Sequence, residues 1–140
     1  PDDNQIDLAE DGKFLGAGWF RGEDIGGVMA RWGGDDLTSE IRVTLIPQDY
    51  HVEFFATPFV DEATLSVVVN GVPMAEFVLT GGWNTYTFDL PTEIIVPDEF
   101  ILIELVHDTM QSPYDMTGGA SSDKRGLTVA YAWIRFVPSR

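Results

Sequence analysis

The sequence of 140 residues contains no cysteine, which excludes disulfide bridges, thiolate metal sites and cysteine nucleophiles. Lysine and arginine are scarce, 8 residues against 23 aspartates and glutamates, and the net charge is −15. This excess of negative charge repels phosphate backbones and anionic lipids, so we expect no nucleic-acid partner and no peripheral membrane binding. No apolar run approaches the roughly 20 residues of a membrane-spanning helix, so direct membrane insertion is not expected either.

A helical apolar period is also missing, because only Leu8-Ala9-Glu10-Asp11 could form a single turn. Short runs rich in β-branched and aromatic residues instead alternate between polar and apolar positions, as strands with one face in solvent do. Eight such runs predict strands over residues 28–32, 40–46, 50–56, 64–69, 74–79, 84–90, 100–106 and 127–137. Glycine pairs and prolines separate them. The sequence therefore predicts an all-β fold, a two-sheet antiparallel β-sandwich that is jelly-roll-like.

The clearest turn signal is Asn70-Gly71 between two apolar runs. This pair is typical of a two-residue type I′ hairpin, because both residues must adopt positive φ. Pro73 has no N–H to donate, so it should face outward on an edge strand or begin its strand. A chain of this length has room for one domain. We expect a single β-sandwich domain over residues 14–140, preceded over residues 1–13 by an acidic tail or an added edge strand.

Seven short segments rich in glycine, aromatic and charged residues carry a resemblance to known proteins. They are residues 16–20, 23–24, 28–32, 69–71, 112–113, 121–127 and 130–136. In this order and spacing they resemble carbohydrate-binding-module-like β-sandwich domains, which are appended to membrane glycosyltransferases and envelope proteins of bacteria and archaea. The resemblance implies an extracellular or cell-surface location. It also implies a non-catalytic role, in binding glycans or as a scaffold close to them.

A cluster of charged residues is the first candidate site. Arg31 lies inside an apolar run, where an unpaired guanidinium would be costly to bury. We expect it to pair with a carboxylate from Glu23, Asp24 or Asp123 in fork geometry. Together with Arg125, these residues form one of two things. They are a structural ion pair that holds the loops at one end of the sandwich, or they are the polar part of a sugar site.

Aromatic side chains are the second candidate, because a pyranose ring has an apolar face that stacks on exposed tryptophan or tyrosine. Trp19 and Phe20 lie in a predicted glycine-rich loop, and Trp83 and Tyr114 lie in other predicted loops. These aromatics are candidate platforms, although Trp19 would equally suit a plug at one end of the core. Aromatics inside predicted strands are expected in the core: Phe54, Phe77, Phe88, Phe100, Tyr131, Trp133 and Phe136. The complete set of candidate ligand-binding residues is Trp19, Glu23, Arg31, Trp83, Tyr114, Asp123 and Arg125.

Metal binding and catalysis have weaker support. Acidic groups at residues 35–36, 61–62 and 98–99, and at Asp7 with residues 10–11, offer the oxygen ligands that calcium prefers, but none has the spacing of a calcium loop. A structural calcium and a solvated acidic surface both remain open, and no other cofactor is expected. His51 and His107 make no persuasive metal site, and no nucleophile-elbow motif is present. A Ser–His–Asp arrangement is recognised by geometry alone, but we expect no catalytic residues.

A second class of function stays open, a structural subunit of a cell-surface filament, sheath or layer. The acidic segment over residues 2–10, in which Ile6 and Leu8 alternate with polar residues, could add as a strand to an exposed edge of a neighbouring copy. Removing residues 1–12 would separate the two classes, because only the strand-exchanging subunit should dissociate. The chain is then either one domain of a longer parent polypeptide or a complete mature product.

Overall fold

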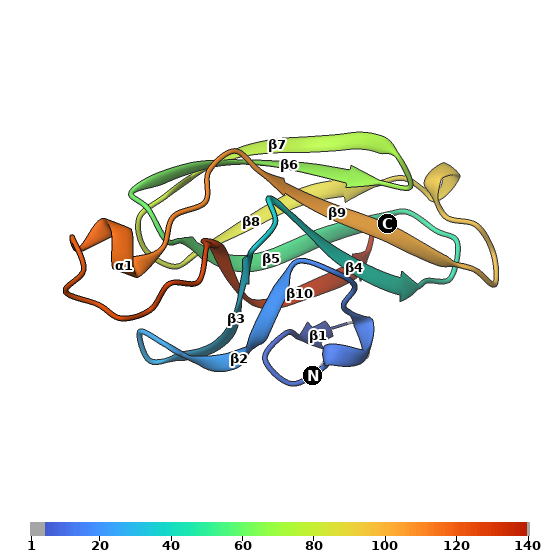
Figure 1. The fold of residues 1–140 in the computed structure, drawn as a ribbon. Coiled ribbons are helices and arrows are strands. Elements are labelled where there is room, and N and C mark those ends of the chain that lie inside the picture. Colours follow the sequence, from blue (N-terminus) through green and yellow to red (C-terminus); the bar gives the residue numbers. More distant parts are fainter. Residues whose placement is uncertain (1–4, 140) are drawn as a thin grey trace.

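The computed structural model describes residues 5–139, which form two antiparallel sheets packed face to face (Figure 1). In chain order the elements are β1 (Gln5–Asp7), the 3₁₀ turn η1 (Gly12–Phe14), β2 (Trp19–Ile25), β3 (Val28–Gly34), β4 (Thr38–Thr44), β5 (Tyr50–Pro58), β6 (Glu62–Val69), β7 (Val72–Thr80), β8 (Asn84–Leu90), the 3₁₀ turn η2 (Thr92–Ile94), β9 (Phe100–His107), α1 (Pro113–Met116) and β10 (Leu127–Pro138). All eight predicted strands are present. The strand that the sequence patterns missed is β2, which was expected to be a glycine-rich loop, and the short elements η1, η2 and α1 were not predicted either.

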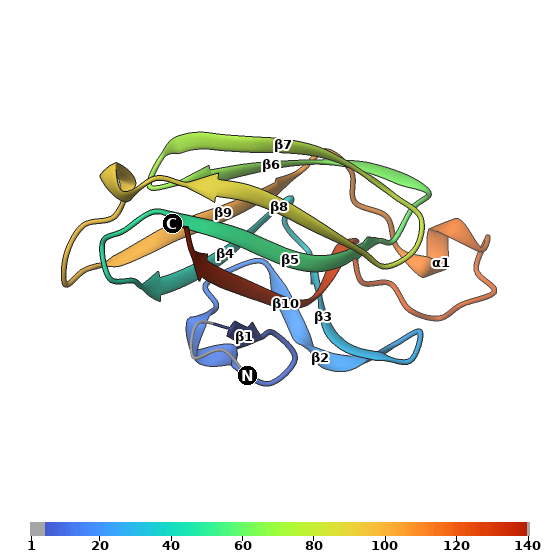
Figure 2. The ribbon, with the colours of Figure 1, turned by 180° about the vertical axis from the view of Figure 1, so that it is seen from behind.

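The two sheets have different sizes. The six-stranded sheet has the order β2-β3-β10-β5-β8, with β1 also paired to β10, and the four-stranded sheet has the order β4-β9-β6-β7. Between β3 and β10 the chain passes repeatedly from one sheet to the other, so that β4, β6, β7 and β9 form one layer and β3, β5, β8 and β10 belong to the other (Figures 1 and 2). This arrangement confirms the predicted two-sheet, jelly-roll-like sandwich.

The core lies between the sheets and follows the period of two. Phe54 is 1% exposed on β5, and Tyr131 and Phe136 are 1% exposed on β10. The prediction for Phe100 is wrong, because its side chain is 57% exposed. Phe100 opens β9 with its ring outside the sandwich, where the guanidinium carbon of Arg42 lies 5.6 Å from the ring centroid. Successive residues of a strand point to opposite faces. Here the buried face is the one that carries Ile101.

The Asn70-Gly71 turn joins β6 and β7 as predicted. Asn70 has φ of 49° and Gly71 has φ of 80°, the positive values that a type I′ hairpin requires. Pro73 is exposed on β7, an edge strand of its sheet, next to a bulge in β7 at Met74. Its missing N–H therefore removes no bond that the ladder needs.

The start of the described chain packs against its own domain. In β1, Ile6 pairs with Ile134 of β10. Ile6 is 4% exposed and Leu8 is fully buried in the core between the sheets. The turn that follows lies so close to β2 that a Cβ on Gly22 would come within 2.3 Å of the carbonyl oxygen of Ala9. Residues 5–9 are thus part of the sandwich.

Candidate functional site

Three of the predicted site residues meet at the end of the sandwich that carries α1 (Figure 1). Glu23 lies on β2, whereas Asp123 and Arg125 lie in the segment that leads into β10. Arg125 donates through Nη1 to Glu23 Oε2 at 2.7 Å and through Nη2 to Asp123 Oδ2 at 2.8 Å. Hydrogen bonds to Asp123 and then Glu23 raise the pKa of Arg125, and the bond from Arg125 lowers the pKa of Asp123. The arrangement stabilises an ionised Asp123 beside a charged Arg125.

An open groove of about 670 Å³ lies beside this cluster, and we call it the β2 groove. Its lining is Phe20, Arg21, Glu23, Asp123 and Arg125. The Arg125 guanidinium carbon lies 5.1 Å from the centroid of the Phe20 ring, which holds the planar group in place. The volume falls within the roughly 300–1,000 Å³ of small-molecule sites. Two guanidinium groups balance two carboxylates, so the groove suits a neutral ligand with many hydroxyl groups better than an ion.

Arg31 does not belong to this groove, and its predicted pairing with a carboxylate is wrong. Within residues 5–139 it binds backbone carbonyls instead, through Nε to Leu8 O at 2.7 Å, Nη1 to Phe20 O at 3.0 Å and Nη2 to Ala9 O at 3.2 Å. Burial lowers the pKa of Arg31. Three backbone carbonyls accept the hydrogen bonds that were expected to go to a carboxylate. Arg31 therefore joins the segment after β1 to β2, and its role is structural.

Trp19 and Tyr114, like Trp83, are predicted aromatic platforms that do not line the β2 groove. Trp19 lies on β2 rather than in a loop, donates through Nε1 to Glu40 O at 2.8 Å and meets the Tyr131 ring edge-on at 5.6 Å. It therefore closes one end of the core. Tyr114 lies on α1 and is 39% exposed, with the Lys124 ammonium 4.9 Å from its ring centroid. Tyr114 remains near Asp123, whose carbonyl accepts its backbone N–H at 2.7 Å.

Trp83 belongs to a row of stacked rings on the outer face of the six-stranded sheet. Its ring lies 5.0 Å from that of Phe55, which in turn lies 5.8 Å from that of Trp133. The prediction that Trp133 is a core residue is wrong, because the side chain is half-buried on the outer face. A β-bulge between Tyr131 and Trp133 is the reason, since the extra residue sends these two side chains to opposite faces. The sequence did contain a signal for this row: Phe54 and Phe55 are consecutive in a strand, so if Phe54 is buried, Phe55 must point outward.

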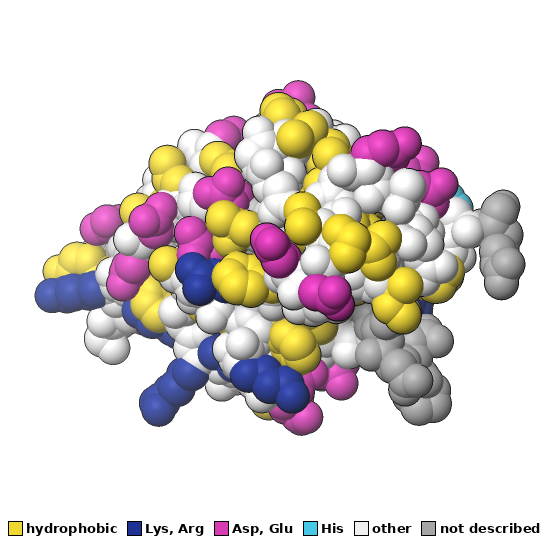
Figure 3. Space-filling model, turned by 90° about the vertical axis from the view of Figure 1, so that its right-hand side faces the viewer, with side chains coloured by type: hydrophobic (Ala, Val, Ile, Leu, Met, Phe, Trp, Pro, Cys, Tyr) yellow, Lys and Arg dark blue, Asp and Glu magenta, His cyan; other side chains and the backbone are white. Residues whose placement is uncertain are grey.

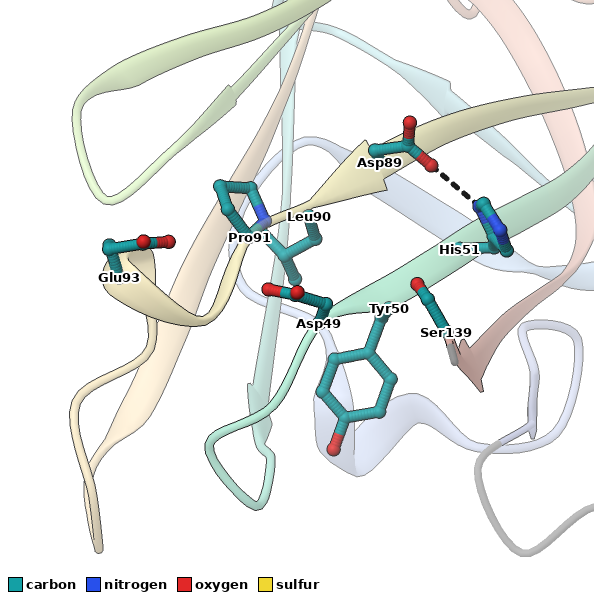
Figure 4. A pocket seen from close by; sticks show the side chains of 8 residues that line it. All are labelled: Asp49, Tyr50, His51, Asp89, Leu90, Pro91, Glu93 and Ser139. Atoms are coloured by element: carbon teal, nitrogen blue, oxygen red, sulfur yellow. Dashed lines mark hydrogen bonds and ion pairs between the residues drawn. The ribbon is translucent and has the colours of Figure 1, made fainter.

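A second pocket, of about 410 Å³, lies at the opposite end of the sandwich, and Figure 4 shows its lining. His51 Nδ1 and Asp89 Oδ1 are 2.5 Å apart, and Ser139 is in the same pocket. Within residues 5–139 no hydrogen bond joins Ser139 to His51 through their side chains. The pocket thus holds the residue types of a hydrolase triad without the serine–histidine bond that activates the nucleophile.

Of the acidic groups considered for calcium, the pair at residues 35–36 is engaged in turns. Asp35 Oδ1 accepts the N–H of Gly126 at 3.1 Å, and Asp36 Oδ1 accepts the N–H of Thr38 at 3.0 Å. In the described part of the chain, no three histidine, aspartate or glutamate side chains come together as a metal site. Nor does any helix within residues 5–139 have the length and apolar character to cross a bilayer.

The surface mixes side chains of different kinds. On the face drawn in Figure 3, acidic side chains are spread over most of the surface, with hydrophobic side chains between them, and lysine and arginine side chains lie mostly in the lower half. A module that carries this much negative charge favours ligands that are neutral or positively charged.

No family model and no curated protein matches this sequence. Solved structures do match. A family 6 module (CBM6) of LamC, a marine laminarinase from Zobellia galactanivorans, is 15% identical with a TM-score of 0.59, over 96% of this chain and 99% of that one. A GH26-CBM35 β-(1,4)-mannanase from Podospora anserina is 14% identical with a TM-score of 0.62, over 99% of this chain and 28% of that one. A CBM36 module with calcium and xylotriose is 13% identical with a TM-score of 0.50, over 94% of this chain and 98% of that one. The chain therefore has the β-sandwich fold of carbohydrate-binding modules, as the sequence resemblance predicted.

Proposed function

We propose that this chain is a non-catalytic, extracytoplasmic module that binds a neutral glycan in the β2 groove. The observation that carries the proposal is the groove itself, in which an arginine braced by two carboxylates lies over an aromatic ring. Its support from known proteins is that matching structures are carbohydrate-binding modules, one of them with xylotriose bound. An extracytoplasmic location follows from the same proposal, because the polysaccharides that such modules bind lie outside the cytoplasm.

The chemistry of the groove suits sugar hydroxyls. Arg125 occupies one side of the Glu23 and Asp123 carboxylates, and the remaining oxygen lone pairs are available to accept hydrogen bonds from hydroxyl groups. Arg21 is exposed at the groove and can donate to ring or hydroxyl oxygens. The part of the Phe20 ring that Arg125 leaves uncovered supplies apolar surface for C–H groups of the sugar. Because the carboxylates and guanidinium are already held in place, little further ordering is needed on binding.

The strand-exchanging surface subunit is not proposed further. In that assembly the N-terminal segment would have to leave its own domain. Ile6 and Leu8 are buried in the core of the same chain, and Arg31 binds the carbonyls of Leu8 and Ala9. Withdrawing this segment would expose two large apolar side chains and leave a partly buried guanidinium without partners.

Replacing Arg21 by glutamine is expected to weaken glycan binding about tenfold, because a hydrogen bond from a charged donor is worth about 1.5–3 kcal/mol. Its melting temperature should stay within about 1 °C of the wild type, since surface substitutions of this kind have small effects. Arg42→Gln is the matched control, because Arg42 is exposed on the four-stranded sheet, away from the groove. The measurement is calorimetric titration with xylan, mannan and β-glucan oligosaccharides.

Asp123→Asn separates a binding cluster from a purely structural ion pair. If the cluster binds sugar, this variant loses affinity at nearly constant stability, because the carboxylate is about one-third exposed and its bridge contributes little. A variant that loses stability but keeps its affinity would contradict the proposal. So would the absence of binding to every cell-wall or storage polysaccharide tested.

A further inference from the structure

A third pocket lies where the N-terminal segment meets the outer face of the six-stranded sheet. Its volume is about 220 Å³, and its lining is Asp7, Ala9, Glu10, Val28, Met29, Phe55, Ala132 and Trp133. We call it the N-terminal pocket. It lies beside β10 and the three strands that pair with β10, namely β1, β3 and β5 (Figure 2). None of its residues lines the β2 groove.

The walls of the N-terminal pocket are apolar. Phe55 and Trp133 stack with an angle of 14° between their ring planes and form one wall. Val28 and Met29 of β3 form another, and Met29 is 55% exposed although it is a large apolar side chain. A volume below the roughly 300–1,000 Å³ of drug-sized sites fits a single ring-sized group rather than a long ligand.

The charge at the rim is of one sign. Asp7 and Glu10 are exposed there, and Asp11 lies in the same turn, where its Oδ2 accepts the N–H of Asp7 at 3.0 Å. No lysine or arginine is among the residues that line the pocket. Arg135 lies over the Trp133 ring, but its guanidinium is bonded to Glu53 Oε1 at 2.7 Å. Among the described residues, the rim carboxylates of Asp7 and Glu10 outnumber Arg31, whose Nη2 donates to Ala9 O, so the pocket presents net negative charge beside aromatic surface, the complement of a cation with an apolar body.

From this combination we infer that the N-terminal pocket binds the protonated amino group and ring of an amino sugar, as in an oligomer of glucosamine. The pyranose ring packs against Met29 and the edges of the stacked rings, and the ammonium group meets Asp7 and Glu10. The net charge of −15 draws a polycationic glycan toward the protein. This site is additional to the neutral-glycan site in the β2 groove and does not depend on it.

The test is calorimetric titration at pH 5.5 with a glucosamine tetramer and, in parallel, its fully N-acetylated form. We expect the charged tetramer to bind at least about tenfold more tightly than the acetylated one, with an affinity that falls as salt is raised. The double variant Asp7→Asn/Glu10→Gln should lose about tenfold in affinity for the charged tetramer. Both substitutions keep the shape of the side chain, and a melting curve confirms that the variant is folded.

The matched control is Asp61→Asn/Glu62→Gln, which makes the same change in net charge at exposed residues before and at the start of β6. It should leave the affinity unchanged. An equal loss in both double variants would overturn the inference, because binding would then reflect overall charge. No binding of the glucosamine tetramer, or binding that survives Asp7→Asn/Glu10→Gln, would overturn it too. Equally tight binding of a lysine tetrapeptide would overturn the assignment to a sugar. None of these outcomes bears on neutral glycans in the β2 groove, which the Arg21 variant tests.

Discussion

Replacing Arg31 by methionine is expected to lower the free energy of unfolding by about 3 kcal/mol. Methionine fills much of the space of the arginine stem, so the loss comes mainly from three hydrogen bonds to the carbonyls of Leu8, Ala9 and Phe20. Those carbonyls belong to the turn after β1 and to β2. Loss of these three hydrogen bonds should therefore loosen the N-terminal segment before the rest of the sandwich unfolds.

The Arg31 prediction is checked by urea unfolding and by hydrogen exchange of residues 5–9. Arg42→Met is the matched control, since Arg42 is half-exposed and its nearest carboxylate oxygen, on Glu40, is 3.8 Å away. The control should cost less than about 1 kcal/mol. Arg31→Lys should fall between the two, because one ammonium group cannot reach all three carbonyls in fork geometry. A stability of Arg31→Met equal to that of the control would contradict the structural role of this residue.

Lowering the pH from 7 to 4 is expected to remove about 3 kcal/mol of stability through His107 alone. His107 is 2% exposed, its Nδ1 lies 2.7 Å from Leu37 O, and its Nε2 lies 2.7 Å from the Tyr131 hydroxyl. Because a carbonyl only accepts, Nδ1 carries the proton and Nε2 accepts from Tyr131. Burial lowers the pKa of His107 from 6.5 to about 4, although the bond to Leu37 and the charge of Asp108 oppose the shift.

The direction of the pH effect follows from where the proton binds. Below about pH 6.5 the unfolded chain takes up a proton at His107 that the folded chain takes up only near pH 4. Stability is therefore complete above pH 6.5 and falls as the pH drops toward 4. Protonation of carboxylates acts in the opposite direction in a chain this acidic, because it reduces charge repulsion. The two effects have to be separated by comparing variants.

His107→Gln provides that comparison, because glutamine can still donate to Leu37 O but does not titrate. Urea unfolding between pH 7 and pH 4 should show the wild type losing about 3 kcal/mol more than His107→Gln over this range. His51→Gln is the control for the same substitution at an exposed position, since His51 lies on the outer side of β5. Parallel curves for wild type and His107→Gln would show that burial of His107 does not govern acid stability.

Much of the fold could be predicted from local sequence patterns. Alternation located eight strands, and Asn70-Gly71 located a hairpin whose two φ angles are positive. These features depend on neighbouring residues only. The strand β2 was missed because its glycine and charged residues resemble a loop, and its pairing with β3 comes from hydrogen bonds that composition does not reveal.

The candidate site was predicted in part. Glu23, Asp123 and Arg125 do meet, although 100 residues of chain separate the first two, because the start of β10 and β2 both flank β3. Arg31 was assigned the wrong partners, since backbone carbonyls can satisfy a guanidinium as well as carboxylates do. Trp133 was assigned to the wrong face, since a one-residue bulge reverses the alternation.

By itself, the sequence determined the all-β class, the absence of cysteine chemistry and the acidic surface, because each depends on composition or on short-range periodicity. The tertiary structure decided which backbone carbonyls accept hydrogen bonds from Arg31 and on which face of the six-stranded sheet Trp133 lies. It also decided where the β2 groove and the N-terminal pocket lie. The physical reason is that these features depend on the register between strands far apart in the chain, and a shift of one residue would send each side chain to the other face.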